Sequence, residues 1–162
     1  MLPREPGSTV IHLRPARTDD AAFLFALFCS ARESEFALLP PPQRESLLRL
    51  QYQAQTRDYA ERYPQAEHFI IECDGESAGR LLLNRDADQL RVVDIAVLPA
   101  MRGRGIASAV LKSLITEAEA AGVPIRLSVW HDNPALTLYR RLGFNVREER
   151  ATHVEMEWRS SS

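Results

Sequence analysis

The chain has 162 residues and a formal net charge of −2, which suits one domain with a sizeable core. Its lysines and arginines are dispersed, so it lacks the basic run that follows a nucleic acid backbone. It also lacks the apolar core of a signal peptide and the stretch of about 20 apolar residues that crosses a membrane. Because Cys29 and Cys73 both lie in apolar segments, we expect buried thiols in a reducing, cytoplasmic protein.

The first part of the chain predicts one strand and two helices. We expect residues 1–8 to form a loose tail ahead of a single domain over residues 9–159. Thr18 precedes an apolar helical stretch and is a suitable N-cap. Prolines 40–42 separate that stretch from a second helical one. The expected elements are a strand over residues 9–15, a helix over residues 22–33 and a helix from Pro42 or Gln43 to Tyr63.

Strands are predicted next. Asp74-Gly75 is typical of a tight β-hairpin turn, and residues 85–88 form a second polar turn. The strand after that turn is apolar except for Asp94, which is typical of a strand buried on both faces. The expected strands cover residues 68–73, 79–84 and 92–98.

A glycine-rich loop connects this central strand to a helix. Arg102-Gly103-Arg104-Gly105 leads into apolar residues at helical spacing, which continue to Ala121 before Gly122 ends the helix. Free backbone N–H groups at a helix N-terminus favour an anion, and glycines let the backbone approach it closely. Because the two arginines can pair with phosphate oxygens, the unit predicts a phosphate-binding loop.

Three kinds of phosphate-binding loop have patterns that partly fit this stretch. A Walker A loop needs Gly-Lys-Ser/Thr, which is absent. A dinucleotide-binding loop needs a third glycine where Ser108 stands, although Asp132 lies roughly where its ribose-binding acid would. Arg102-Gly103-Arg104-Gly105-Ile106-Ala107 fits Arg/Gln-x-x-Gly-x-Gly/Ala and resembles the pyrophosphate loop of the GNAT superfamily of acyl-CoA-dependent N-acetyltransferases. The alternative is an ordinary turn that uses glycine for tightness.

A second motif strengthens the resemblance. After a predicted strand over residues 125–130, Asn133-x-Ala135-x-x-Leu138-Tyr139-x-x-x-Gly143-Phe144 is similar to the second GNAT signature. A short helix from Asn133 to Leu142 and strands over residues 144–149 and 154–158 complete the chain. The resemblance implies an α/β (α+β) fold: a mixed, mostly antiparallel central sheet with a parallel βαβ core and flanking helices. A doubly wound dinucleotide-binding sheet does not fit antiparallel strands ahead of the loop.

The resemblance also implies acetyl-CoA as co-substrate, with no metal. The loop would hold the pyrophosphate, and the ends of two splayed strands would pair with the pantetheine arm. Asn133 would contact that arm, cap its helix, or do both through different atoms. The residues assigned to the cofactor are Ala96, Val97, Leu98, Arg102, Gly103, Arg104, Gly105, Ile106, Ala107, Asn133 and Tyr139.

Two residues are candidates for catalysis. The Tyr139 phenol is a candidate general acid for the departing thiolate; the alternative is a packing role. Burial of Asp94 beside the thioester would favour a general base; the alternative is a carboxylate bonded to the backbone or to an arginine. Water can also accept the proton, and His131 and Glu72 are weaker candidates.

These assignments predict transfer of an acetyl group from acetyl-CoA to a primary amine by direct attack in a ternary complex. The alternatives are a different acyl group and a non-catalytic acyl-CoA sensor. The acceptor is a small-molecule or peptide amine, with neither nucleic acid nor membrane as partner. Residues 33–43 are expected to cover its side of the site, where Glu33 or Glu35 could attract a cation. Nothing marks an oligomer interface, so a homodimer is expected only as the commonest assembly.

Overall fold

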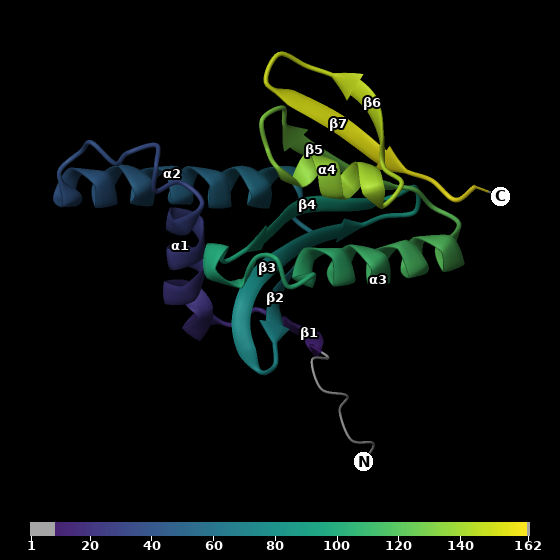
Figure 1. Ribbon diagram of the computed structural model, residues 1–162, viewed down its shortest axis with the longest axis horizontal. Coiled ribbons are helices and arrows are strands. Elements are labelled where there is room, and N and C mark those ends of the chain that lie inside the picture. Colours follow the sequence, from purple (N-terminus) through teal and green to yellow (C-terminus); the bar gives the residue numbers. More distant parts are fainter. Residues whose placement is uncertain (1–8, 162) are drawn as a thin grey trace.

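The computed structural model describes residues 9–161, and the tail expected over residues 1–8 lies outside them. The described chain forms a seven-stranded sheet in the order β1-β2-β3-β4-β5-β7-β6 (Figure 1). Every neighbouring pair is antiparallel except β4 and β5, which are parallel. The predicted fold class is therefore confirmed. The strands are β1 (Ile11–Pro15), β2 (Glu67–Cys73), β3 (Glu76–Arg85), β4 (Leu90–Val97), β5 (Ile125–Trp130), β6 (Asn145–Glu149) and β7 (His153–Trp158).

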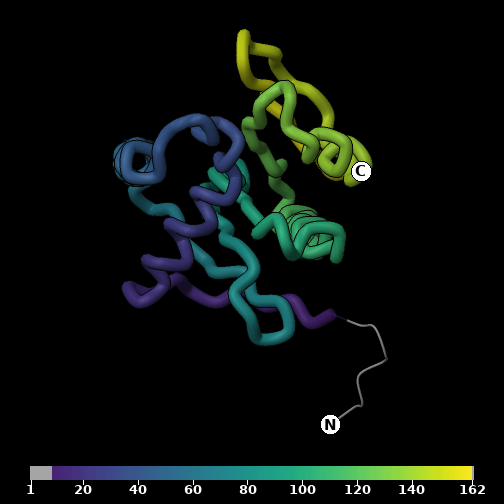
Figure 2. The backbone as a smooth tube through the Cα atoms, turned by 60° about the vertical axis from the view of Figure 1, so that its left-hand side comes forward, coloured from purple at the N-terminus to yellow at the C-terminus, as the bar shows by residue number. Residues whose placement is uncertain are grey.

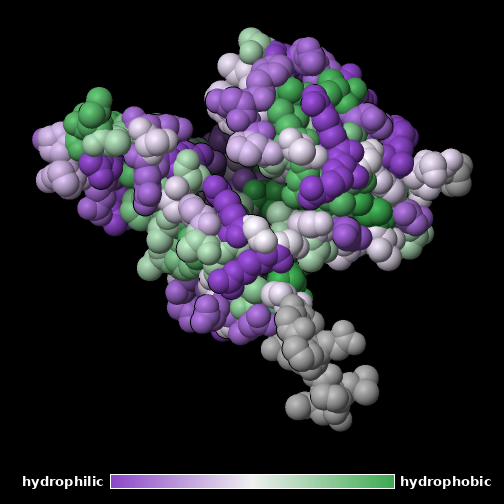
Figure 3. Space-filling view, viewed as in Figure 1, coloured by the Kyte–Doolittle hydropathy of each residue, from purple (hydrophilic) through white to green (hydrophobic). Residues whose placement is uncertain are grey.

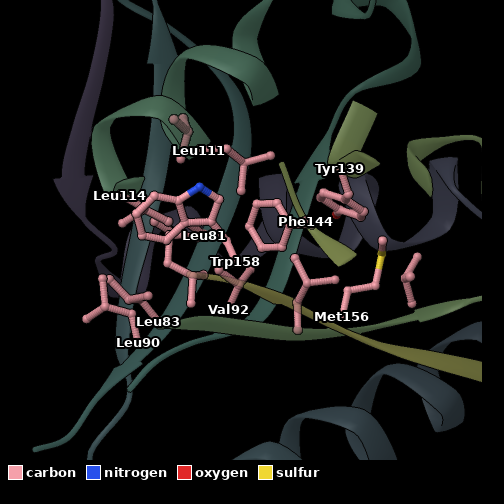
Figure 4. Close-up of a cluster of buried hydrophobic side chains, with 14 of the residues drawn as sticks. Leu81, Leu83, Leu90, Val92, Leu111, Leu114, Tyr139, Phe144, Met156 and Trp158 are labelled. Atoms are coloured by element: carbon pink, nitrogen blue, oxygen red, sulfur yellow. The ribbon is translucent and has the colours of Figure 1, made fainter. Parts of the chain in front are cut away.

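Helices cover both faces of the sheet. A cluster of buried side chains joins α3, α4 and one face of the sheet, with Leu111, Tyr139, Phe144 and Trp158 among its members (Figure 4). Buried residues outside this cluster come from the first two helices and from alternate positions of β2 and β3. Because successive strand residues point to opposite faces, α1 and α2 cover the other face. The helices are α1 (Ala21–Ser30), α2 (Pro41–Arg62), α3 (Ile106–Ala121) and α4 (Ala135–Arg141).

The start and the end of α1 differ from the prediction. Thr18 does not cap the helix, because a 3-10 turn over Thr18–Asp20 precedes it. Asp20 fixes that turn: its carboxylate accepts from the Arg17 backbone N–H at 2.7 Å and from both terminal nitrogens of Arg14 at 2.8 and 2.9 Å. The helix ends at Ser30 rather than residue 33, where the Ser30 hydroxyl donates to the Leu27 carbonyl at 2.7 Å. A serine that competes for backbone acceptors weakens helix continuation.

The turns and helix ends of the other elements follow the sequence signals. Asp74 and Gly75 both have positive φ, as the tight hairpin between β2 and β3 requires. Gly122 ends α3 in the left-handed conformation. Asn133 caps α4, because its side-chain oxygen accepts the Ala135 N–H at 2.9 Å.

The parallel joint between β4 and β5 is short. Beyond it the two strands diverge, and the N-terminal and C-terminal parts of the sheet separate (Figure 2). Next to the joint, one extra residue in β4 shifts its register with β3. Further along, a Cβ on Gly79 would lie 2.0 Å from the Ala96 oxygen, so only glycine lets β3 approach β4 this closely. The joint comprises Leu90, Arg91 and Val92 paired with Ile125, Arg126 and Leu127.

Three further observations concern residues 9–161. None of their helices has the length and apolar character that a membrane crossing requires. Their His, Cys, Asp and Glu side chains form no group of three or more that could hold a metal ion. Cys29 and Cys73 are free thiols, the first half-buried and the second buried.

Candidate active site

A cleft with a volume of about 1890 Å³ lies where β4 and β5 diverge. Figure 3 shows the surface hollowed between the arm formed by α1 and α2 and the part formed by β5, β6 and β7. On one side the cleft is lined by the start of α3 and by residues of α4, including Leu138 and Tyr139. On the other side it is lined by α1, α2, β3 and β4. The predicted catalytic residues Tyr139 and Asp94 both line it.

The glycine loop, residues 102–105, lines the cleft on the α3 side. Gly103 and Gly105 have φ values of 80° and 74°, a left-handed conformation that favours glycine. A Cβ on either would meet no atom within 4 Å, so the space beside the loop is open. Within residues 9–161, the backbone N–H groups of residues 103–107 have no hydrogen-bond partner. The loop therefore presents several free donors at the N-terminus of α3.

The end of β4 offers one free edge. The Leu98 N–H donates to the Ala78 carbonyl at 2.8 Å, so Leu98 is bonded toward β3. The Ala96 oxygen also lies against β3, beside Gly79. Because backbone groups of successive strand residues face opposite edges, Val97 faces the gap toward β5. The Val97 carbonyl accepts a bond from the Arg102 side chain at 3.4 Å. Of the three predicted pantetheine contacts, only Val97 thus has its backbone groups on the open edge.

Tyr139 lies on the α3 and α4 side of the sheet. Its side chain is 6 % exposed and its ring centroid is 5.7 Å from that of Phe144 (Figure 4). Burial raises the pKa of Tyr139 to about 12, and the negative charge of Asp94 adds to the shift. In the described part of the chain its hydroxyl has no hydrogen-bond partner. The phenol therefore keeps its proton near neutral pH, with that donor unused.

Asp94 lies on the opposite face of the sheet. Its pairing with Leu82, and that of Ala96 with Arg80, place these four residues under α1 and α2. The Asp94 carboxylate accepts from Arg80 Nε at 2.7 Å, and a second Arg80 nitrogen donates to the Gln55 side chain at 3.0 Å. Arg80 is only 8 % exposed, so the pair is fixed in place. The arginine partner foreseen as the alternative for Asp94 is therefore present.

The weaker base candidates are engaged elsewhere. Glu72 accepts from Arg14 Nε at 2.9 Å, and the His131 ring binds the Arg150 carbonyl at 2.7 Å. Neither residue lines the cleft. Of the two glutamates considered for a cationic acceptor, Glu35 lines the cleft and Glu33 does not.

The sequence did not indicate most of the side chains that line the cleft beneath α1 and α2. Arg32, Gln55 and Tyr59 line it, and burial raises the pKa of Tyr59 to about 12. On the β5 side, the centroid of the exposed Trp130 ring lies 4.2 Å from the centroid of the His153 ring. The other side chains come from segments far apart in the chain. The only sequence signal is one stripe of the predicted second helix, which carries Tyr52, Tyr59 and Tyr63.

Comparisons with known proteins agree with this geometry. The model of the acetyltransferase (GNAT) family matches residues 29–144, which include the glycine loop and α4. The spermidine N(1)-acetyltransferase of Escherichia coli (strain K12) is 26% identical over 149 residues, covering 89% of this chain and 77% of that protein.

Solved structures share the fold. The PaiA N-acetyltransferase of Thermoplasma acidophilum, solved in complex with coenzyme A, has a TM-score of 0.70 at 17% identity and covers 93% of this chain and 99% of that one. The ribosomal-protein-S18-alanine N-acetyltransferase of Escherichia coli has a TM-score of 0.62 at 21% identity, covering 94% and 96%. With the family match over residues 29–144 and this shared fold, the chain belongs to the acetyltransferase (GNAT) family and is an N-acetyltransferase.

Proposed function

We propose that this chain transfers an acetyl group from acetyl-CoA to a primary amine by direct attack in a ternary complex. The observation that carries the proposal is the gap between β4 and β5, which has a protonated phenol on one face and a fixed carboxylate on the other. A thioester in that gap would be reached by an acid from the α4 side and by an amine from the α2 side.

The donor fits the α3 side of the cleft. The free N–H groups of residues 103–107 and the charges of Arg102 and Arg104 suit a pyrophosphate. The open edge at Val97 suits an amide of the pantetheine arm, paired as a neighbouring strand would be. Asn133 uses its side-chain oxygen for the cap of α4, which leaves its amide N–H groups for the same arm. A neighbour of this fold binds coenzyme A, which supports the assignment.

The chemistry then follows from the two faces. The amine nitrogen attacks the thioester carbonyl carbon, and the carbon–sulfur bond breaks as the new carbon–nitrogen bond is completed. Tyr139 gives its proton to the departing sulfur, and the proton lost by the amine restores the phenol through water. Asp94, held by Arg80, attracts the acceptor's ammonium and takes one proton from it before attack, so that the proton restoring the phenol is the second one, lost after the carbon–nitrogen bond has formed. That one relative is named a spermidine acetyltransferase supports an amine as acceptor.

The test is release of coenzyme A by the purified protein. Acetyl-CoA is offered with a panel of amines, and thiol appearance is followed beside calorimetric binding of the donor. Direct attack predicts initial-rate lines that intersect when both substrates are varied, whereas an acyl-enzyme would give parallel lines. Donor binding without thiol release above the rate of hydrolysis would instead identify a sensor. Propionyl-CoA and longer donors, run in parallel, show whether acetyl is the preferred group.

A further inference from the structure

The charges that line the cleft are unevenly partnered. In the described part of the chain, three carboxylates of the cleft have arginine partners: Asp94 with Arg80, Glu155 with Arg91, and Glu148 with Arg150. The two carboxylates without one, Glu35 and Asp132, are solvent-exposed. A cationic group entering the cleft therefore meets no buried, unpaired carboxylate.

Arg32 is the reverse case. It is half-buried, it lines the cleft, and within residues 9–161 it has no carboxylate partner. Its guanidinium carbon lies 3.7 Å from the centroid of the Phe28 ring, and one terminal nitrogen donates to the Phe28 carbonyl at 3.2 Å. This stacking fixes the group while most of its five N–H donors remain unused.

The surroundings of Arg32 suit an anion. Tyr59 is close enough that the Arg32 charge lowers the pKa of its phenol, although burial still leaves that pKa raised, at about 12. Tyr59 therefore stays protonated and can donate a hydrogen bond. The Arg80 guanidinium carbon lies 5.9 Å from the centroid of the Tyr59 ring, and Arg32, Tyr59 and the Arg80–Asp94 pair all line the same cleft. A fixed guanidinium fork with a neighbouring donor is the arrangement that binds carboxylates in proteins.

We propose, building on the function above, that the acceptor is an amine that also carries a carboxylate, and that Arg32 binds this carboxylate while Asp94 receives the amine. A polyamine would bring a second positive charge against Arg32 and Arg80, and like charges in a partly buried site oppose binding. Arg32 is thus the residue that determines acceptor class.

The experiment compares acceptors that differ in one charge. Thiol release from acetyl-CoA is measured for α-amino acids, for ω-amino acids with a longer spacing, for the carboxamides of both, and for spermidine. In the ω-amino acids the amine lies far from the carboxyl group, so acid and carboxamide have nearly equal amine basicity and a preference for the acid there reports the carboxylate. The wild type is expected to favour at least one acid over its carboxamide by about tenfold or more in kcat/KM.

Two arginine variants then assign the preference. Arg32→Gln should lower kcat/KM for that acid by roughly tenfold to a hundredfold, mostly through KM, while its carboxamide changes by less than about twofold. Arg32→Lys should recover part of the loss. The matched control is Arg49→Gln: Arg49 also lies over a phenylalanine, 4.3 Å from the Phe25 centroid, but it is paired with Glu45 and does not line the cleft. It should leave both acceptors unchanged.

Other outcomes overturn the proposal in distinguishable ways. Faster turnover of spermidine than of every acid, together with a raised spermidine KM in Glu35→Gln, would establish a cationic acceptor and leave the acetyltransferase function intact. An equal loss for acid and carboxamide in Arg32→Gln would assign Arg32 to structure alone. Release of no coenzyme A with any amine would overturn the proposed function as well.

Discussion

The two walls of the cleft are built by different means. The donor wall uses backbone groups and caps from two short, continuous segments, residues 102–107 and 133–143, and its shape depends on left-handed glycines. The acceptor wall uses side chains from α1, α2, β3 and β4, held by ion pairs such as Arg80 with Asp94. A wall of local backbone suits one invariant ligand, whereas a wall of separate side chains can change its specificity one residue at a time.

The largest effect is expected where the backbone wall is blocked. Gly105→Glu places a carboxylate in the open space beside the loop, where it repels a pyrophosphate and removes several charge-assisted bonds. Acetyl-CoA affinity should fall by about a thousandfold or more, measured by calorimetry. Gly75→Glu is the matched control, because Gly75 has a φ of 85° and open space but lies in the hairpin between β2 and β3. If Gly105→Glu binds as the wild type does, the loop is not the pyrophosphate site.

A smaller loss is expected from Tyr139→Phe, which keeps the ring packed on Phe144 and removes only the hydroxyl. We expect kcat to fall by roughly 10–10³-fold with little change in acetyl-CoA affinity, because water replaces the acid only partly. An acyl donor with a more acidic leaving thiol should recover part of the loss. Tyr52→Phe, which alters a tyrosine packed on Phe25 and Phe28 outside the cleft, should leave kcat unchanged. An unaltered kcat in Tyr139→Phe, with chemistry rate-limiting, would leave Tyr139 a packing role.

The acceptor wall should respond to Asp94→Asn with a loss of about tenfold in kcat/KM for the amine. This change also removes the carboxylate partner of the buried Arg80, so stability will fall. Asp20→Asn breaks a similar pair with Arg14, and neither residue lines the cleft, which makes it a control for lost stability alone. Denaturation curves and rates for both variants separate the two effects. Equal activity in the two variants would show that Asp94 only supports the fold.

The smallest effect concerns alkaline stability, to which each wall contributes one tyrosine: Tyr139 is buried and Tyr59 half-buried. Burial raises the pKa values of Tyr59 and Tyr139 to about 12, whereas an unfolded tyrosine titrates near about 10. Below about pH 10 both states keep the proton and the stability is fully present. From there to about pH 12 the unfolded chain ionises first, so the free energy of unfolding falls. Urea denaturation at stepped pH should show this decline, and Tyr139→Phe should reduce its slope.

The loop and helix ends that form the donor wall could be predicted from sequence because their signals are local. Gly105 and Gly122 mark the ends of α3, and Asn133 and Gly143 mark those of α4, within a few residues of the groups they position. The one refinement concerns Ala96 and Leu98. Their backbone groups face β3, which depends on the register of β4 after its bulge and cannot be read from residue types.

Apart from Asp94 and Glu35, the acceptor wall could not be predicted, because its partners are distant in sequence. Arg80 on β3 donates to Asp94 on the neighbouring strand β4 and to Gln55 on α2, which lies 25 positions earlier in the chain. The position of Arg32 depends on α1 ending at Ser30, earlier than its apolar pattern indicates. Periodicity identifies which face of an element is buried, but it does not pair one charged side chain with another.

The short joint between β4 and β5 has a mechanical consequence. Only three residues on each strand pair before β4 and β5 diverge. Beyond them, the edge of β4 at Val97 has no neighbouring strand within residues 9–161 to pair with. A donor lying along the free edge at Val97 would supply that strand, and its binding free energy would also hold the two parts together. Departure of the product would then loosen the molecule along its weakest line, so that the stiffness of the whole sheet would follow the catalytic cycle.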